Sequence, residues 1–484
     1  MKGLLLALGV GWGAATAHAA DLVAVYQRAL QNDPTLREAE ANRLAALEAK
    51  PQALAALLPQ LSANGTISHE RDSGRQNTTE VVTLPTCTAA TAGSGTCVPP
   101  GTANNLFESF PFNGYVDTTT HKYTLDLKQS VFRWENWVAL RRADSQVAQA
   151  EADYQAAKQD LMARVAQRYF DVLGAEDDLD AQEVALLSVT RQLEQAEARY
   201  SIGLIAVTDV EEARASHDTT AAAVIADKRT LAGTQELLRE ITGDLFDFLA
   251  RPNEPFELAN PDPISEDRWV DMALQQNLSL VSSRLAADIA RENINIARGG
   301  HFPSLDLVGS YGHLNSNGVD TFPDGSPAGG QTLDQNQRSI GLQLTIPLSS
   351  GGLVSSQVRQ ATYQHRAAKE RLERVARQTE HDARDAYLGV LSEISRVKAL
   401  RRAAESNNTA LKATESGYEA GTRTAVDVLQ SRQQWVQAQT DYARSRYDYM
   451  INVIKLQQAA GILSEETLQR LNELLNDAPP ATAR

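Results

Sequence analysis

Long apolar runs are scarce in this sequence of 484 residues. Beyond residue 19, no stretch approaches the roughly 18 to 20 uninterrupted apolar residues that a membrane-spanning helix needs. If the chain crosses a membrane, it must do so with strands. Residues 1–19 combine a positive charge at Lys2, a short apolar run and the small-residue ending Ala17-His18-Ala19, which predicts a cleaved secretory signal peptide. An anchor helix is the alternative, but the run is too short to span a bilayer and no cysteine follows it to accept a lipid.

Cysteine is almost absent, because the whole chain has only Cys87 and Cys97. They lie close together in a segment rich in Thr, Gly, Ala and Pro, within a chain predicted to enter an oxidising compartment. The pair therefore predicts one disulfide in a surface loop. A metal pair is the alternative, but it lacks His or further Cys at suitable spacing.

Motifs for catalysis and cofactor binding are also missing. The eight histidines are scattered, and the sequence has no H-E-x-x-H, no G-x-S-x-G, no phosphate-binding loop and no dinucleotide fingerprint. His381 with Asp382 and Asp385 is better explained as a solvated helix face than as an acid cluster. We therefore expect no enzyme activity, no cofactor and no metal site.

Positive charge is in deficit, since the formal net charge is −15 and the isoelectric point is about 5.1. Binding of nucleic acid requires clustered Lys and Arg, and no such cluster is visible. The acidity suits a pathway for cations instead.

The chain does contain an internal repeat. Each half runs through a short helix, a Leu-Pro or Phe-Pro step, a strand pair, a long helix and a Gly-containing turn. A linker at residues 246–264 with four prolines separates the halves. The matching pairs, in order, are Ala29-Leu30-Gln31-Asn32 with Ala273-Leu274-Gln275-Gln276, Leu58-Pro59-Gln60-Leu61 with Phe302-Pro303-Ser304-Leu305, and Tyr200-Ser201-Ile202-Gly203 with Tyr418-Glu419-Ala420-Gly421.

Four segments alternate apolar and other residues with period two, as strands with one apolar face do. They begin near Leu61, Tyr123, Leu305 and Ile340. Each is about ten residues long, which is the length that a tilted strand needs to cross the hydrocarbon layer. Four strands cannot close a barrel alone, and open edges are not tolerated in lipid, so several chains must share one barrel. The connections at residues 72–118 and 315–336 are expected to be long outward-facing loops.

Apolar residues spaced by three and four continue over residues 135–200 and 352–418, which predicts coiled-coil helices of roughly 100 Å each. An ordinary bundle core is the alternative, but no compact domain holds helices of that length. Shorter helical pieces at 34–56 with 207–243, and at 278–299 with 424–461, sum to a similar length in each half. Asp33-Pro34 supplies one of them with a cap and a first-turn proline.

These patterns predict a mainly α fold with membrane strands. The expected segments are the signal peptide 1–19, first-repeat helices 20–60, first strand pair 61–132, first helical hairpin 133–245, linker 246–264, second-repeat helices 265–300, second strand pair 301–349, second helical hairpin 350–462, and a C-terminal helix and tail 463–484. The tail from Asn476 is expected to be disordered.

Residues 417–429, Gly-Tyr-Glu-Ala-Gly-Thr-Arg-Thr-Ala-Val-Asp-Val-Leu, closely resemble the helix-turn-helix tip of the TolC family of outer-membrane efflux proteins. Residues 199–210 resemble the tip of the first half, and residues 443–449 resemble the closing helix of the family. The resemblance covers nearly the whole chain after the signal peptide. It implies a homotrimer with a shared twelve-stranded barrel in outer-membrane lipid and a periplasmic coiled-coil tunnel. It also implies an exit duct for efflux or type I secretion that works with a periplasmic adaptor and an inner-membrane pump.

The resemblance further implies a gate at the tip, formed by Asp209, Tyr418, Arg423 and Asp427. Asp209 of one helical pair would accept hydrogen bonds from Tyr418 and Arg423 of another. Asp427 would contribute to a ring of carboxylates that favours cations. The family often has a second acidic position one turn later, but this chain has Gln430 there, which weakens the expected field.

Each tip residue also has a simpler structural explanation. Thr424 with Asp427, and Thr208 with Glu211, match the capping-box pattern at a helix start. Gly203 and Gly421 suit tip turns, since glycine supplies positive φ where a helix ends. At the level of the whole chain, the alternative to a channel is a periplasmic adaptor, which would need one hairpin flanked by small β domains rather than two hairpins and four strands.

Overall fold

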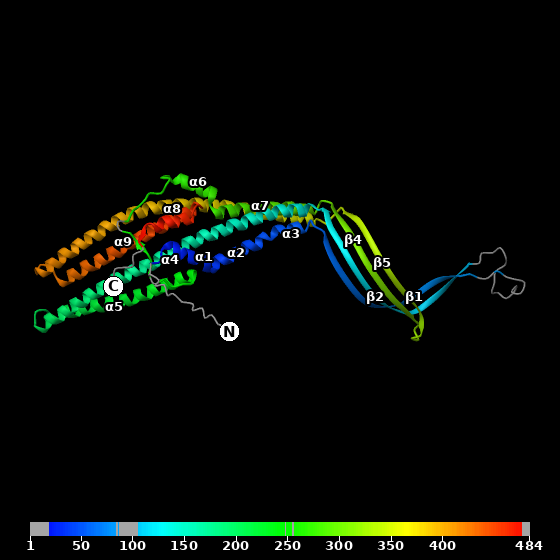
Figure 1. Ribbon diagram of the computed structural model, residues 1–484, viewed down its shortest axis with the longest axis horizontal. Helices are drawn as coiled ribbons and strands as arrows, with labels where there is room; N and C mark the ends of the chain where they lie inside the picture. Colours follow the sequence, from blue (N-terminus) through cyan, green and yellow to red (C-terminus); the bar gives the residue numbers. More distant parts are fainter. Residues whose placement is uncertain (1–18, 84–85, 87–104, 247, 254–255, 477–484) are drawn as a thin grey trace, which may run out of the picture. The chain divides into compact units, whose positions relative to one another are not determined.

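The structure is a computed structural model that describes residues 19–83, 86, 105–246, 248–253 and 256–476 (Figure 1). Cys87 and Cys97 lie outside the described residues. The chain divides into two compact units. The helical unit holds residues 1–50, 141–294 and 359–484, and the sheet unit holds residues 51–140 and 295–358. None of the described helices is both long enough and apolar enough to cross a membrane.

The sheet unit contains one antiparallel sheet with the strand order β1-β2-β4-β5. Its strands are β1 (Gln60–Thr83), β2 (Asn105–Phe132), β4 (Ser304–Thr321) and β5 (Pro327–Thr345). Strands β1 and β5 are the two edges, and each has one neighbour in this sheet. The four strands lie where the period-two pattern predicts them, so the two strand pairs of the repeat form a single sheet.

The two faces of the sheet differ in chemistry. Across the sheet, Leu61 pairs with Leu127, which pairs with Gly309, which pairs with Ile340. This row faces one side, together with other exposed apolar residues at alternate positions. The opposite face carries Asn64, Thr124 and Ser310, whose side chains all donate to Asp126 at 2.9 to 3.0 Å. Near the strand ends that join the helices, one face is therefore apolar and the other is hydrogen-bonded and polar.

The strands are longer than the sequence analysis expects, with 24, 28, 18 and 19 residues rather than about ten. Most of the predicted loop at 315–336 and both flanks of the one at 72–118 belong to strands. Backbone pairing explains the difference, because two hairpin arms can continue their ladder of N–H and C=O groups after the apolar alternation ends. Polar side chains do not interrupt such a ladder.

Two helical hairpins dominate the helical unit. They are formed by α4 (Trp134–Ser201) with α5 (Val207–Thr242), and by α8 (Leu353–Glu419) with α9 (Ala425–Ala459). Helices α4 and α8 have 68 and 67 residues, which corresponds to roughly 100 Å each, as predicted. Shorter helices precede the strand pairs, namely α1 (Leu22–Asn32), α2 (Pro34–Leu47), α3 (Ala49–Ala55), α6 (Glu266–Gln276) and α7 (Leu278–Gly299).

The repeat extends to the helix caps. Asp33, which is almost fully buried, accepts a hydrogen bond from Leu36 N at 2.9 Å and starts α2 with Pro34 in its first turn. Asn277 does the same for α7, since its side chain accepts from Leu280 N at 3.1 Å. Both caps satisfy an N–H group that a helix start leaves without a partner.

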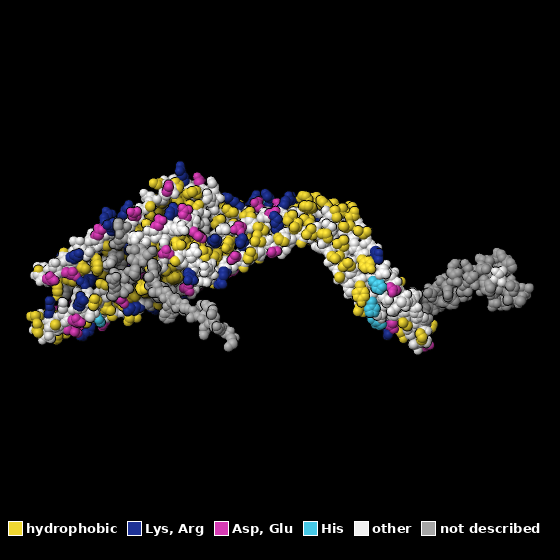
Figure 2. Space-filling model, in the orientation of Figure 1, with side chains coloured by type: hydrophobic (Ala, Val, Ile, Leu, Met, Phe, Trp, Pro, Cys, Tyr) yellow, Lys and Arg dark blue, Asp and Glu magenta, His cyan; other side chains and the backbone are white. Residues whose placement is uncertain are grey.

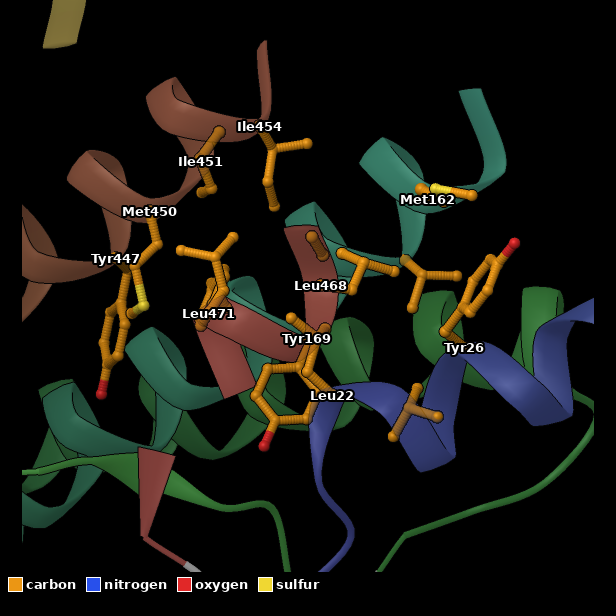
Figure 3. Close-up of a cluster of buried hydrophobic side chains, with 14 of the residues drawn as sticks. Leu22, Tyr26, Met162, Tyr169, Tyr447, Met450, Ile451, Ile454, Leu468 and Leu471 are labelled. Atoms are coloured by element: carbon orange, nitrogen blue, oxygen red, sulfur yellow. The ribbon is translucent and has the colours of Figure 1, made fainter. Parts of the chain in front are cut away.

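The main apolar core lies in the helical unit, where α1, α4, α9 and α10 (Glu465–Asn472) meet (Figure 3). Tyr169 is fully buried there, and its hydroxyl lies 3.1 Å from the carbonyl of Ala20 and 2.8 Å from that of Ala250. It thereby ties Ala20 to the linker between the repeats. The short strands β3 (Arg251–Pro252) and β6 (Leu475–Asn476) pair beside it, so Asn476 belongs to a strand, whereas the tail was predicted to become disordered at this residue. The rest of the predicted tail lies outside the described residues.

Candidate functional site at the helical tips

The two hairpins of the helical unit end in turns of the same geometry. Gly203 and Gly421 both have a φ of 76°, in the left-handed region that favours glycine. Gly203 N donates to Tyr200 O at 2.8 Å, and Gly421 N donates to Tyr418 O at 3.0 Å. The following residues, Leu204 and Thr422, donate back to the last turn of α4 and α8 in the same way. Both halves of the repeat therefore present equivalent tips.

Asp427 caps helix α9. Its carboxylate accepts from the backbone N and from the hydroxyl of Thr424, both at 2.9 Å, and Asp427 N donates to Thr424 Oγ1 at 3.2 Å. These bonds form the capping box that the T-x-x-D pattern indicates. The backbone N–H and hydroxyl of Thr424, together with the charge of Arg423, hold the pKa of Asp427 below its ordinary value. The carboxylate is thus kept ionised at the start of the helix.

Asp209 occupies the equivalent position in α5, where its carboxylate accepts from Ala206 N at 3.2 Å. The suggested box of Thr208 with Glu211 is wrong, because α5 begins at Val207 and Thr208 already lies inside the first turn. Glu211 instead bonds to Arg214 at 2.8 Å. In the described part of this single chain, Asp209 does not bond to Tyr418 or Arg423, and those contacts remain predictions for an assembly.

Tyr418 joins the two hairpins within the chain through a residue that sequence reasoning missed. Arg199 Nη1 donates to the Tyr418 hydroxyl at 2.7 Å, and the guanidinium lies 5.5 Å from the centre of the tyrosine ring. Arg199 occupies the repeat position of Gly417. A side chain at Gly417 would approach Arg423 Cγ to 2.9 Å, so the glycine leaves room for Arg423. The difference between Arg199 and Gly417 at equivalent positions of the repeat was the one signal in the sequence that pointed to this contact.

A second polar cluster, also missed, lies where the linker crosses α4. Arg251 bonds to Asp177 at 2.9 Å and to Glu176 and Asp180 at 3.2 Å. The Tyr447 hydroxyl donates to Asp177 at 2.6 Å. Burial raises the pKa of Asp177, and the Tyr447 hydroxyl and Arg251 charge oppose that shift; burial also raises the pKa of Glu176. We call these residues the linker clamp, because one guanidinium holds the linker against three carboxylates of α4.

No group of three or more His, Cys, Asp and Glu side chains suited to a metal ion is found among the described residues. The chain as a whole matches known proteins over almost its full length. The family model described as outer membrane efflux protein matches residues 25–244 and 269–462. The chain belongs to this family.

The curated relatives agree with this assignment. Outer membrane protein TolC of Vibrio cholerae is 32% identical over 469 residues, with 97% of each chain covered. Outer membrane protein TolC of Escherichia coli is 33% identical over 481 residues, covering 98% of this chain and 88% of that protein. Among solved structures, the CmeC outer membrane channel of Campylobacter jejuni has the same fold, with a TM-score of 0.71 at 19% identity, covering 96% of this chain and 90% of that one.

The protein is therefore an outer-membrane exit channel of the efflux and type I secretion class, with helices that extend into the periplasm. This result confirms the predicted fold class and resemblance. It also decides between the two function hypotheses, because the family is one of channels and not of periplasmic adaptors.

Proposed function

We propose that three copies of this chain form the exit duct, with one twelve-stranded barrel built from the four strands of each copy. The observation that carries this proposal is the sheet itself. Strands β1 and β5 are both edges, and one face of the sheet carries an apolar band that includes Leu61, Leu125 and Ile340. In lipid, edge N–H and C=O groups must be paired, and pairing β1 of one copy with β5 of the next closes the sheet.

Cysteine cross-linking between copies tests this assembly. Ser62 and Ser68 on β1, and Ser339 on β5, all alternate onto the polar face, so Ser→Cys changes little else. In a background with Cys87 and Cys97 replaced by serine, Ser62→Cys or Ser68→Cys combined with Ser339→Cys should give a covalent trimer in at least one register. The matched control is Ser310→Cys with Ser62→Cys, because β4 has strand neighbours on both sides within its own chain. Covalent dimers alone, or cross-linking by the control pair, would contradict the shared barrel.

We propose, further, that Asp209, Tyr418, Arg423 and Asp427 keep the periplasmic end closed. Arg423 and Asp209 are exposed in the single chain and are therefore available to a neighbouring hairpin. A charged Arg to Asp hydrogen bond is about twice as strong as a neutral one, so Arg423 would be the strongest tie. The Arg199 to Tyr418 bond would hold the tyrosine in place on its own side.

Passive uptake of a large hydrophilic dye by cells that make the channel tests the gate. Arg423→Ser should raise uptake severalfold, because the tie to Asp209 is lost. Arg401→Ser is the control, since Arg401 is also exposed on α8 but pairs with Glu405 one turn away at 3.1 Å. Equal uptake by both variants and the wild type would contradict the gate, and would leave Asp209 and Arg423 with structural roles at the helix tips alone.

The partners that we propose are a periplasmic adaptor and an inner-membrane pump, docked at residues 200–208 and 418–424. Ile202 and Leu204 at the first tip are 70% and 68% exposed, and Tyr200 and Val207 beside them are exposed as well; such a group of apolar side chains is typical of an interaction surface. The pump would supply the energy, and this chain would perform no chemistry of its own. A photo-cross-linker at Leu204 should capture the adaptor, whereas one at Arg401 should not. Capture at both positions would contradict docking at the tips.

A further inference from the structure

The apolar face of the sheet ends in a group of histidines from three different strands. Strand register places Ile67, His121, Asn315 and Asp334 in one row across the sheet. His313 lies one row nearer the strand ends that join the helices, paired with Tyr123, and His69 lies one row farther away, paired with Thr119. All three histidines therefore point to the same side as Leu61 and Ile340. Figure 2 shows histidine side chains gathered at one level of the strands.

The height of these rows can be worked out from the strand geometry. At the helix-joining end of the sheet unit, the rings of Trp134 and Phe302 are 5.5 Å apart. From Phe302 to Tyr311 is nine residues, or about 30 Å of strand, which a tilt of about 40° reduces to roughly 23 Å. That span matches the apolar band of about 25 Å between the two aromatic girdles of a membrane barrel. Tyr311 and Tyr123, which are 48% and 54% exposed, thus mark the outer girdle, and the histidine rows lie at headgroup level.

Two arginines accompany the histidines on this face. Arg71 bonds to Asp117 at 2.6 Å, and Arg338 lies 5.3 Å from the centre of the Tyr311 ring. We call the set of His69, His121, His313, Arg71 and Arg338 the histidine belt. These five side chains, all of which can donate hydrogen bonds from nitrogen, come from all four strands of the sheet.

The carboxylates on the same face are Asp117 and Asp334. Asp117 lies 3.8 Å from His69 Nε2, and Asp334 lies 3.7 Å from His313 Nδ1. The other charged groups of these rows, namely Glu70, Asp72, Lys122 and Asp320, alternate onto the opposite face. The two arginines are thus balanced by two carboxylates.

We propose that the histidine belt binds the anionic phosphate groups of lipids in the outer leaflet. The inference rests on the proposed barrel, which places this face against lipid. A lipid fits better than a protein or a free anion, because the belt continues directly into the apolar band, so one molecule can place its phosphate on the belt and its chains on the leucines below. Imidazole and guanidinium groups both donate hydrogen bonds to phosphate oxygens.

Lipid binding to the purified trimer, measured by native mass spectrometry, tests the belt. The probes are phosphatidic acid and zwitterionic phosphatidylcholine with the same chains, with inorganic phosphate as a competitor. The wild type should prefer phosphatidic acid by roughly fivefold, the ratio that corresponds to about 1 kcal/mol, and inorganic phosphate should not displace the lipid from it. In the triple variant His69→Gln, His121→Gln, His313→Gln, this preference should disappear.

The matched control is Lys122→Gln with Lys128→Gln, which removes positive charge from the opposite face. It should keep the wild-type preference. The belt is refuted if the histidine variant behaves as the wild type, or if the lysine variant loses the preference equally. Full displacement by inorganic phosphate would also overturn it, in favour of a small-anion site. Covalent trapping of the trimer through β1 and β5 in the same preparations separates a failure of the belt from a failure of the barrel.

Discussion

Replacement of Arg251 by glutamine tests how much the linker clamp contributes to the stability of the helical unit. The Arg251 guanidinium lies 2.9 to 3.2 Å from three carboxylates, and two of them, on Glu176 and Asp177, are only 19% and 16% exposed. At an effective dielectric constant of about 20, unit charges about 3 Å apart attract by roughly 5 kcal/mol before desolvation is subtracted. Removing one partner of a fully buried pair costs about 3–5 kcal/mol. Because Arg251 is itself 31% exposed, we expect Arg251→Gln to lower stability by about 2–4 kcal/mol near neutral pH.

The loss should depend on pH with a definite sign. Burial raises the pKa of Asp177 and Glu176 above their ordinary values of 3.8 and 4.5. An acid with a raised folded-state pKa contributes most to stability below its ordinary value, and the contribution is lost as pH rises through the folded-state pKa. Arg251 limits that loss by stabilising the ionised forms. Without Arg251, the carboxylates stay protonated to higher pH. The loss of stability caused by Arg251→Gln should therefore be small at about pH 4.5 and reach its full size at about pH 8.

Thermal unfolding of the purified protein at fixed scan rate, followed by circular dichroism, measures this prediction. The control is Arg401→Gln, whose exposed pair on one helix contributes at most about 0.5 kcal/mol. The double variant Arg251→Gln, Asp177→Asn should recover part of the loss, since it removes a buried carboxylate that has lost its ion pair with Arg251. An equal loss at both pH values, with no recovery in the double variant, would refute the account of the linker clamp.

Four further substitutions can be measured by the same unfolding assay. Asp33→Ala removes both the α2 cap and a buried partner that lies 3.0 Å from Arg164, so it should cost about 2–3 kcal/mol; a loss below that of Arg401→Gln would contradict this. Tyr169→Phe leaves the carbonyl groups of Ala20 and Ala250 without its hydroxyl and should cost about 1–3 kcal/mol, and a neutral effect would show that the hydroxyl is dispensable. Gly421→Ala should destabilise by about 1 kcal/mol because of the positive φ, whereas Gly174→Ala, inside α4 with open space around it, should stabilise by about 0.5–1 kcal/mol.

Much of the architecture could be predicted from the sequence, because its signals are long and repeated. The three-four spacing over α4 and α8 extends for many turns, and the period-two segments locate all four strands of the sheet. The extent of the strands could not be predicted in the same way. Beyond residue 71 of β1, for example, pairing depends on backbone groups that every residue has, so side-chain alternation no longer marks it.

Contacts at the helical tips could be predicted from the sequence only where they join residues that are close together in the chain. The Thr424 to Asp427 box follows from spacing alone, whereas the Thr208 to Glu211 box fails because the helix starts two residues earlier than that pattern assumes. Contacts between distant segments were missed. Arg199 meets Tyr418 across 219 positions, and Arg251 meets Asp177 across 74, so no local pattern joins them.

Single-channel conductance in a planar bilayer tests the central claim, that the protein is a channel closed at its helical tips. The comparison is between the wild type and the double variant Arg423→Ser, Tyr418→Phe, each as a folded trimer. The account predicts a small conductance for the wild type that rises severalfold in the variant, because the variant removes both of the contacts to Asp209 that we propose. A measurable conductance that is the same in both proteins would support a channel but would show that these residues act only in helix capping and packing. No conductance from either trimer would contradict the claim itself.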